Sequence, residues 1–392
     1  MIYVGIDVAS AKHDFNIISS SGKQYKTKSI TIQNNQEGFK KLHQSIKDFC
    51  GVCNDYEVRI GIESTGFYHL NLVFYLLHQE FKISVINPIL TNMYKKSKHV
   101  HTPKNDNIDS LAICNYLKDN FEYFKPYTIK SYHTESLKSL SRERFKVVEE
   151  LRQAKLSYYR ILTQLFPEYL TLFSNVYQGS ALNIIEHYPS PSKLSRAHLD
   201  SIKELIHGKC KTTAEDVLNA AKASIGNDSE YLSFSLVQTI KTLKFLEAKD
   251  KDYVDMIMYY VKQLDTKIIT IKGVGYITAG IILGEIGDIT RFKNAEHLIS
   301  YAGLDIEVYE SGNFKATNHR ISKKGSKYLR YGLWQIAKIC WKFDPVFNLY
   351  YHKKKNEGKH YYVILGHIEK KLVRVIYSVL KSNKEYTPQN TI

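Results

Sequence analysis

At 392 residues the chain is long enough to bury more than one hydrophobic core, and we expect two or three domains. A hydrophobic content of 43% without low-complexity tracts excludes a disordered or fibrous protein, and a formal net charge of +16 favours nucleic acid as the partner. No apolar run is long enough to span a bilayer and the N-terminus lacks a signal-peptide core, so we predict a cytoplasmic protein with no membrane partner.

The N-terminal residues predict an α/β domain with a mixed sheet, because a three-strand meander precedes alternating helices and strands. The first strand is almost continuously apolar except for Asp7, a carboxylate that is costly in a central strand unless a partner or a metal neutralises it. The expected strands cover residues 2–8, 15–18, 25–32, 58–63 and 83–86, and the expected helices cover residues 35–49 and 67–79.

Asp7 and Glu63 each lie at the carboxyl end of an apolar strand, where open α/β sheets place their sites. Each follows a glycine two residues earlier on the same face, Gly5 and Gly61. We expect the missing side chains to leave room beside the carboxylates for a metal or a phosphate backbone. The alternative is an ordinary strand-end aspartate and a glutamate exposed at a loop.

Asp106 and Asp109 lie three residues apart on one face at the start of a helix predicted over residues 110–118. Alone, such a pair is more typical of a helix N-cap than of a catalytic site. Four carboxylates close together remain ionised only with cations between them, and two divalent ions suit in-line phosphodiester chemistry. The basic loop that precedes the pair is predicted to bind nucleic acid through Lys96, Lys98 and Lys104.

Three motifs resemble the RuvC-like domain of the insertion-sequence one-ten family of DEDD transposases. They are Gly-Ile-Asp7-Val-Ala, Gly-Ile-Glu63-Ser-Thr-Gly and Lys-Asn-Asp106-Asn-Ile-Asp109. The resemblance implies an RNase H-like, RuvC-like fold whose four acids, Asp7, Glu63, Asp106 and Asp109, bind metal. The expected cofactor is Mg, as two divalent ions.

Residues 137–165 and 236–264 place side chains of one seam at alternating spacings of three and four, which predicts a coiled coil. A shorter polar insert separates the two runs, so we expect an antiparallel helix pair. Each seam holds one charge, Arg144 and Asp250, and we predict that these opposite charges fix the register. The pair is either a structural spacer or, as the resemblance implies, an element for dimerisation and for scaffolding RNA or DNA.

The C-terminal residues carry two stretches that can bind phosphate groups. The loop with Lys272, Gly273 and Gly275 can expose backbone N–H groups at a helix start, although a tight helix connection is an equally good interpretation. It is not a nucleotide-binding glycine fingerprint. A dense basic turn that opens a later helix is predicted to bind a phosphate backbone through Lys323, Lys324, Lys327 and Arg330.

Ser311-Gly is by itself an ordinary turn dipeptide. The ordered set Gly-Val-Gly275, Tyr-Ala-Gly303-Leu, Ser311-Gly and Lys-Lys-Gly-Ser-Lys-Tyr-Leu-Arg330 resembles the transposase domain of the same family. That resemblance implies that Ser311 is the nucleophile. The chain departs from the family at Asp305, since a proline usually follows shortly after Gly-Leu there.

Three domains are predicted: a RuvC-like catalytic domain over residues 1–130, a coiled coil with a helical insert over 131–265, and a mostly α-helical transposase domain over 266–392. The resemblance implies a DNA transposase of an insertion sequence, a recombinase that cleaves and exchanges strands through a metal-assisted phosphoserine intermediate. Its implied partners are donor and target DNA, a non-coding bridge RNA that guides it, and further copies of the chain in a dimer or tetramer. We expect it to associate with the nucleoid.

Other functions fit parts of the sequence. A RuvC-like Holliday junction resolvase would use water as the nucleophile and the C-terminal residues only for binding. A non-catalytic nucleic-acid scaffold would be expected to have lost its acids, whereas all four are present. An actin-like sugar kinase shares the Gly-Ile-Asp strand start but needs phosphate loops that are missing from the sequence.

Overall fold

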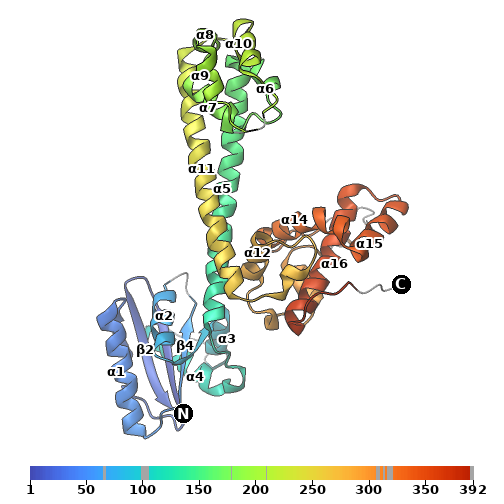
Figure 1. Ribbon diagram of the computed structural model, residues 1–392. Helices are drawn as coiled ribbons and strands as arrows, with labels where there is room; N and C mark the ends of the chain where they lie inside the picture. Colours follow the sequence, from blue (N-terminus) through green and yellow to red (C-terminus); the bar gives the residue numbers. More distant parts are fainter. Residues whose placement is uncertain are drawn as a thin grey trace. The chain divides into compact units, whose positions relative to one another are not determined.

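The computed structural model describes residues 1–64, 68–98, 106–177, 179–208, 210–305, 310–311, 314–315 and 321–388, with the backbone alone at 106–108, 123, 310–311 and 314–315. The chain divides into two compact units, Met1–Tyr132 and His133–Ile392 (Figure 1). The finer division into three domains, with boundaries at 130 and 265, stays a prediction. None of the helices described is both long enough and apolar enough to cross a membrane.

A five-stranded sheet forms the centre of the first unit, in the order β3-β2-β1-β4-β5. Strand β1 pairs antiparallel with β2 and parallel with β4, which confirms the predicted α/β domain with a mixed sheet. The elements are β1 (Ile2–Val8), β2 (Lys12–Ser19), β3 (Ile30–Gln33), α1 (Gln36–Cys53), β4 (Val58–Glu63), α2 (Leu70–His78), β5 (Lys82–Ile86), α3 (Pro88–Lys98), α4 (Asp106–Asp119) and the 3-10 helix η1 (Phe121–Tyr123).

Helices cover both faces of this sheet. The even-numbered residues of β1, such as Val4 and Ile6, pack in one core cluster with the apolar sides of α1 and α2. Tyr3 faces the other way and packs with Ile113 and Leu117 of α4. Because side chains alternate along a strand, Asp7 shares the α4 face of the sheet with Tyr3 and Gly5.

Gly5 and Gly61 allow α4 to lie directly on the strands. A Cβ atom at Gly5 would lie 2.2 Å from the carbonyl oxygen of Ser110, and one at Gly61 would lie 2.7 Å from Leu117 Cδ1. The prediction that these glycines leave room for a metal or a phosphate backbone was therefore wrong, because α4 fills that space.

Several predicted boundaries also differ from the structure. In place of the strand predicted over residues 25–32, the structure has the shorter β3, Ile30–Gln33. Helix α4 begins four residues before the predicted helix start at residue 110. The basic segment from Lys95 to Lys98, expected in a loop, is the last turn of α3. These differences arise because burial against the rest of the fold, rather than local pattern, decides where an element ends.

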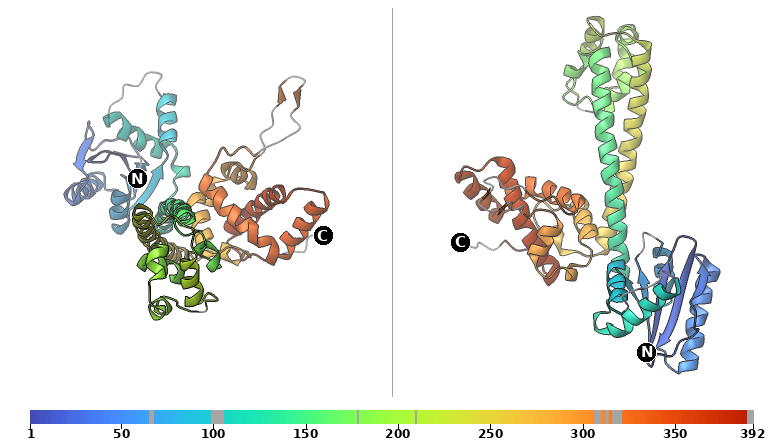
Figure 2. Two further views of the ribbon diagram at one scale, coloured as in Figure 1. Left: turned by 90° about the horizontal axis from the view of Figure 1, so that it is seen from above. Right: turned by 180° about the vertical axis from the view of Figure 1, so that it is seen from behind.

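Two long helices, α5 (Ile129–Leu165) and α11 (Glu230–Gln263), lie side by side (Figures 1 and 2). All of α11, and all of α5 except its first four residues, belong to the second unit. Arg144 Nε lies 2.9 Å from Asp250 Oδ1, so the two seam charges pair across the helices. Whether this ion pair sets the register stays a prediction. The insert between the helices shares one hydrophobic core with the adjoining ends of α5 and α11. It contains α6 (Tyr169–Leu172), α7 (Gly179–His187), α8 (Pro191–Ser195), α9 (Leu199–Glu204) and α10 (Ala214–Lys222).

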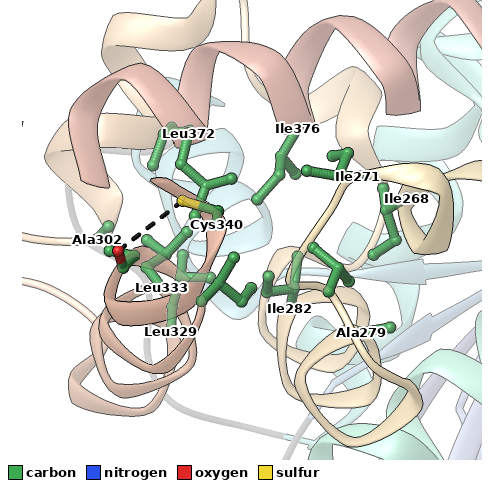
Figure 3. Close-up of a cluster of buried hydrophobic side chains, with 14 of the residues drawn as sticks. Ile268, Ile271, Ala279, Ile282, Ala302, Leu329, Leu333, Cys340, Leu372 and Ile376 are labelled. Atoms are coloured by element: carbon green, nitrogen blue, oxygen red, sulfur yellow. Dashed lines mark hydrogen bonds between the residues drawn. The ribbon is translucent and has the colours of Figure 1, made fainter. Parts of the chain in front are cut away.

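The C-terminal residues form a mostly helical bundle, as predicted. Side chains from several helices meet in one core, where Ile282, Leu333 and Leu372 lie together (Figure 3). The elements are η2 (Lys267–Thr270), α12 (Tyr276–Ile286), η3 (Ile289–Arg291), α13 (Ala295–Tyr301), β6 (Glu310–Ser311), β7 (Phe314–Lys315), α14 (Lys327–Phe343), α15 (Pro345–Asn356) and α16 (Tyr361–Ser382).

Candidate active site

The strand register places the first two acids beside each other at the ends of adjacent strands. Strands β1 and β4 run parallel with Ile6 beside Ile62, so the next residues along each strand are Asp7 and Glu63. Adjacent strands are about 4.8 Å apart, and both carboxylates are half-buried on the face that α4 covers. A third acid, Asp14, lies opposite Asp7 on the antiparallel strand β2.

Helix α4 carries the other two predicted acids. Its Ser110 carbonyl lies over Gly5, and the Ser110 hydroxyl accepts a hydrogen bond of 2.9 Å from Asn16 Nδ2 of β2. These contacts hold the first turns of α4 at the end of β1 that carries Asp7. Asp109 immediately precedes Ser110, whereas the side chain of Asp106 lies outside the described residues.

Helix α3 supplies partners for two of the acids. The Thr91 hydroxyl, which is fully buried, donates to Glu63 Oε2 at 3.0 Å. Lys95 Nζ lies 2.6 Å from Asp109 Oδ1, with side chains that are 17% and 28% exposed. Thr91 was not predicted from the sequence, and Lys95 was noted only as part of the basic stretch that precedes the acids. Neither contact could be predicted, because a side-chain hydrogen bond between separate elements has no local signature.

The predicted nucleic-acid ligands on this unit differ in their surroundings. Lys96 is exposed at the end of α3. Lys98 Nζ lies 3.1 Å from Asp119 Oδ2, which also accepts a hydrogen bond of 2.5 Å from the Tyr94 hydroxyl. The hydrogen bond from Tyr94 and the nearby Lys98 ammonium hold the pKa of Asp119 below its usual value. Lys104 lies outside the described residues.

The acids present suit a hard divalent cation. Asp7, Glu63 and Asp109 offer only carboxylate oxygens, which are the donors that magnesium and similar ions prefer. Among the residues that the structure describes, however, no group of three or more His, Cys, Asp or Glu side chains is close enough to hold a metal ion. Asp109 instead has the Lys95 ammonium as its cation.

The predicted nucleophile belongs to the second unit. Ser311 is the last residue of β6 and pairs with Phe314 of β7, and its side chain lies outside the described residues. We refer to the residues between Asp305 and Ser322 as the serine-bearing segment. Asp305 and Ser322, which flank it, are hydrogen-bonded to each other. The Ser322 hydroxyl donates to the Asp305 carboxylate, and the Ser322 amide donates to the Asp305 carbonyl at 2.9 Å.

The motifs that contain Gly303 and Gly325 pack against each other next to Asp305 and Ser322. Gly303 has a φ of +67°, and a Cβ there would lie 2.8 Å from Arg330 Nη1. A Cβ at Gly325 would lie 2.3 Å from the Tyr301 carbonyl oxygen. Arg330 Nη1 donates to the Ala302 carbonyl at 2.8 Å, so this predicted phosphate ligand also fastens the two motifs together.

The other predicted nucleic-acid ligands of this unit lie on two turns. Lys323, Lys324 and Lys327 are exposed, and Lys272 is exposed on the turn before α12. The Gly275 amide donates to Thr278 Oγ1 at 3.0 Å. A Cβ at Gly273 would lie 3.1 Å from Cys340 Cα. These contacts favour a tight helix connection, and phosphate binding by Gly273 and Gly275 stays a prediction.

Two protein-family models together match most of the chain. A model of the DEDD transposase of IS110, described as a transposase, matches residues 4–167. A second model, described as the transposase of the IS116/IS110/IS902 family, matches residues 265–352. The chain belongs to the IS110 transposase family. It is therefore a DNA transposase with a RuvC-like DEDD fold, as its motifs indicated.

Relatives of this IS110-type transposase extend over nearly its whole length. The pilin gene-inverting proteins of Moraxella bovis and Moraxella lacunata are each 25% identical over 387 residues, which cover 98% of this chain and 97% of the relative. An IS110 protein of Streptomyces coelicolor is 24% identical over 240 residues, 58% of each chain. The structure of Thermus thermophilus RuvC covers 32% of this chain and all of its own, with 12% identity and a TM-score of 0.24.

Proposed function

We propose that this IS110-type transposase cleaves and rejoins DNA with Asp7, Glu63, Asp106 and Asp109 as metal ligands and Ser311 as the nucleophile. The observation that carries the proposal is the register of β1 and β4 beneath α4, which brings Asp7 and Glu63 level beside the first turns of that helix. Two magnesium ions held there would stabilise the charge that develops on the phosphate and activate the attacking oxygen.

Residues of α3 would prepare the acids for this role. Lys95 neutralises and orients Asp109 before substrate binds, and Thr91 fixes one oxygen of Glu63. Once released from Asp109, the Lys95 ammonium would be available to a phosphate of the incoming DNA. Positioned donors of this kind save the reorganisation that a flexible carboxylate would need during the reaction.

The covalent step would be a phosphoryl transfer to serine. The Oγ of Ser311 attacks the scissile phosphorus, the bond from phosphorus to the sugar oxygen breaks, and that sugar hydroxyl leaves with the proton that Ser311 gives up. A hydroxyl of a second strand then attacks the phosphoserine and releases Ser311. The phosphoester retains the bond energy of the cleaved strand, so the exchange needs no ATP.

The proposed partners are donor DNA, target DNA and a non-coding bridge RNA that guides the exchange, with the transposase acting as a dimer or tetramer. The charge of +16 supports polyanionic partners. The side chains and loop residues proposed to bind phosphate are Lys96, Lys98, Lys104, Lys272, Gly273, Gly275, Lys323, Lys324, Lys327 and Arg330.

A covalent-trapping experiment tests the proposal. The full chain is incubated with Mg²⁺, labelled duplexes that carry the DNA flanking its gene, and RNA transcribed from that flank, and the products are separated under denaturing conditions. Wild type should give a labelled protein band that Ser311→Ala lacks, and Asp7→Asn should give neither adduct nor cleavage. Cleavage by Ser311→Ala without a protein adduct would instead support a resolvase that uses water, and cleavage by Asp7→Asn would refute the metal site.

A further inference from the structure

Helix α5 packs against the C-terminal bundle at Leu137 and Lys138. A Cβ at Gly284 of α12 would lie 2.5 Å from the backbone nitrogen of Lys138, so the two helices touch backbone to backbone. Leu137 of α5 is fully buried and belongs to the same core cluster as α12, α14 and α16. This contact fixes the part of α5 around Leu137 relative to those helices.

One residue beyond this crossing, α12 places a carboxylate in the interior. Glu285 is 2% exposed. Arg142 of α5 reaches it with two parallel hydrogen bonds, Nε to Oε1 at 2.6 Å and Nη2 to Oε2 at 3.0 Å. The Ser326 hydroxyl donates to Glu285 Oε2 at 2.7 Å. The buried charge is therefore fully partnered, by two elements that are distant in the sequence.

Ser326 links this network to the basic turn. Its oxygen accepts a hydrogen bond of 3.1 Å from the Leu329 amide and so caps the N-terminus of α14. The guanidinium of Arg142 also lies over the Tyr328 ring, 4.7 Å from its centroid. Phe145, one turn along α5, meets the same ring edge-on with 5.2 Å between centroids. Helix α5 thus contacts the first turn of α14 from two successive turns of its own.

We propose that Arg142 is a positioning residue for the serine-bearing segment. Through Glu285 and Ser326 it fixes the basic turn. The Lys324 amide of that turn donates to the Ser322 hydroxyl at 3.3 Å, and Ser322 in turn donates to Asp305 at the other end of the segment. This role rests on the proposed function of Ser311. A planar guanidinium is required, because a lysine ammonium would make a point contact and could not hold both carboxylate oxygens while lying on an aromatic ring.

The test separates positioning from simple neutralisation of a buried charge. In the double variant Arg142→Met with Glu285→Gln, no charge is left unpaired, and the glutamine oxygen can still accept from Ser326. We expect its melting temperature to lie within a few degrees of wild type and its Kd for the flanking-DNA duplex to change less than about threefold. The rate of adduct formation at saturating duplex should fall roughly tenfold to a hundredfold. Arg152→Met, which removes an exposed arginine from the same helix, should match wild type in all three measurements.

Two outcomes would overturn the inference. Recovery of the wild-type adduct rate in the double variant would show that Arg142 only neutralises Glu285. If the double variant does not fold, Arg142→Lys decides, since it keeps the charge but not the paired hydrogen bonds; a wild-type rate there also refutes positioning. Adduct formation that needs Ser311 but not Arg142 would leave the proposed function intact, whereas an adduct formed by Ser311→Ala would remove its basis.

Discussion

Replacing Gly5 with alanine tests the packing on which the acid site depends. The added Cβ would lie 2.2 Å from the Ser110 carbonyl oxygen and 2.6 Å from the Cys114 amide nitrogen, whereas ordinary van der Waals contact begins at 3.4 Å. Both are backbone atoms of α4, so the helix must move from β1 by roughly 1 Å. Overpacking of this kind destabilises a protein by about 1–3 kcal/mol. A displacement of roughly 1 Å at the proposed catalytic acids can slow the reaction about a hundredfold.

Urea denaturation and the adduct-forming rate of the same preparation measure these two effects. Gly51→Ala provides the matched control, because Gly51 lies in α1 and a Cβ there would meet nothing within 4 Å. That control should keep the wild-type rate, and its free energy of unfolding should rise by up to about 1 kcal/mol, since alanine is the better helix former. If Gly5→Ala unfolds at the wild-type urea concentration and reacts at the wild-type rate, α4 does not lie on β1 as described.

Three further changes have defined outcomes. Asp250→Ala leaves the half-buried Arg144 unpaired and should lower the free energy of unfolding, measured by urea titration, by about 1–3 kcal/mol. The double variant Arg144→Asp with Asp250→Arg, which exchanges the two charges, should recover most of that free energy. Burial raises the pKa of Glu369 to about 8, so its stabilising contribution is complete below its usual pKa of 4.5 and is lost as the pH rises through 8. The melting temperature of wild type should therefore fall between pH 5 and 9 relative to Glu369→Gln, and parallel curves would contradict a neutral buried carboxyl. Thr91→Val removes the hydroxyl that donates to Glu63 and should slow adduct formation about tenfold at unchanged DNA affinity.

The positions of Asp7 and Glu63 could be predicted from the sequence, because each interrupts or ends a run of apolar residues whose period is that of a strand. The ion pair between Arg144 and Asp250 follows similarly, since a charge in each of two otherwise apolar seams has only the other as a partner. Both inferences use local periodicity, which the structure preserves.

The surroundings of these residues could not be predicted in the same way. The sequence reveals that Gly5 lacks a side chain but not that the backbone of α4 occupies the space. The partners Thr91 and Glu63 are 28 residues apart, and Arg142 and Glu285 are 143 residues apart. No periodicity relates such pairs, because their contacts depend on how helices pack over the sheet or against one another.

The meeting of Gly303 with the basic turn has a consequence for engineering. Tyr301, Gly303, Gly325 and Arg330 join the two ends of the serine-bearing segment through contacts that involve only residues outside it. Exchange of residues 306–320 for those of a relative would therefore leave these contacts in place. Such a chimaera would test the proposed role of Ser311 in a bundle that keeps α13 fastened to the N-terminus of α14.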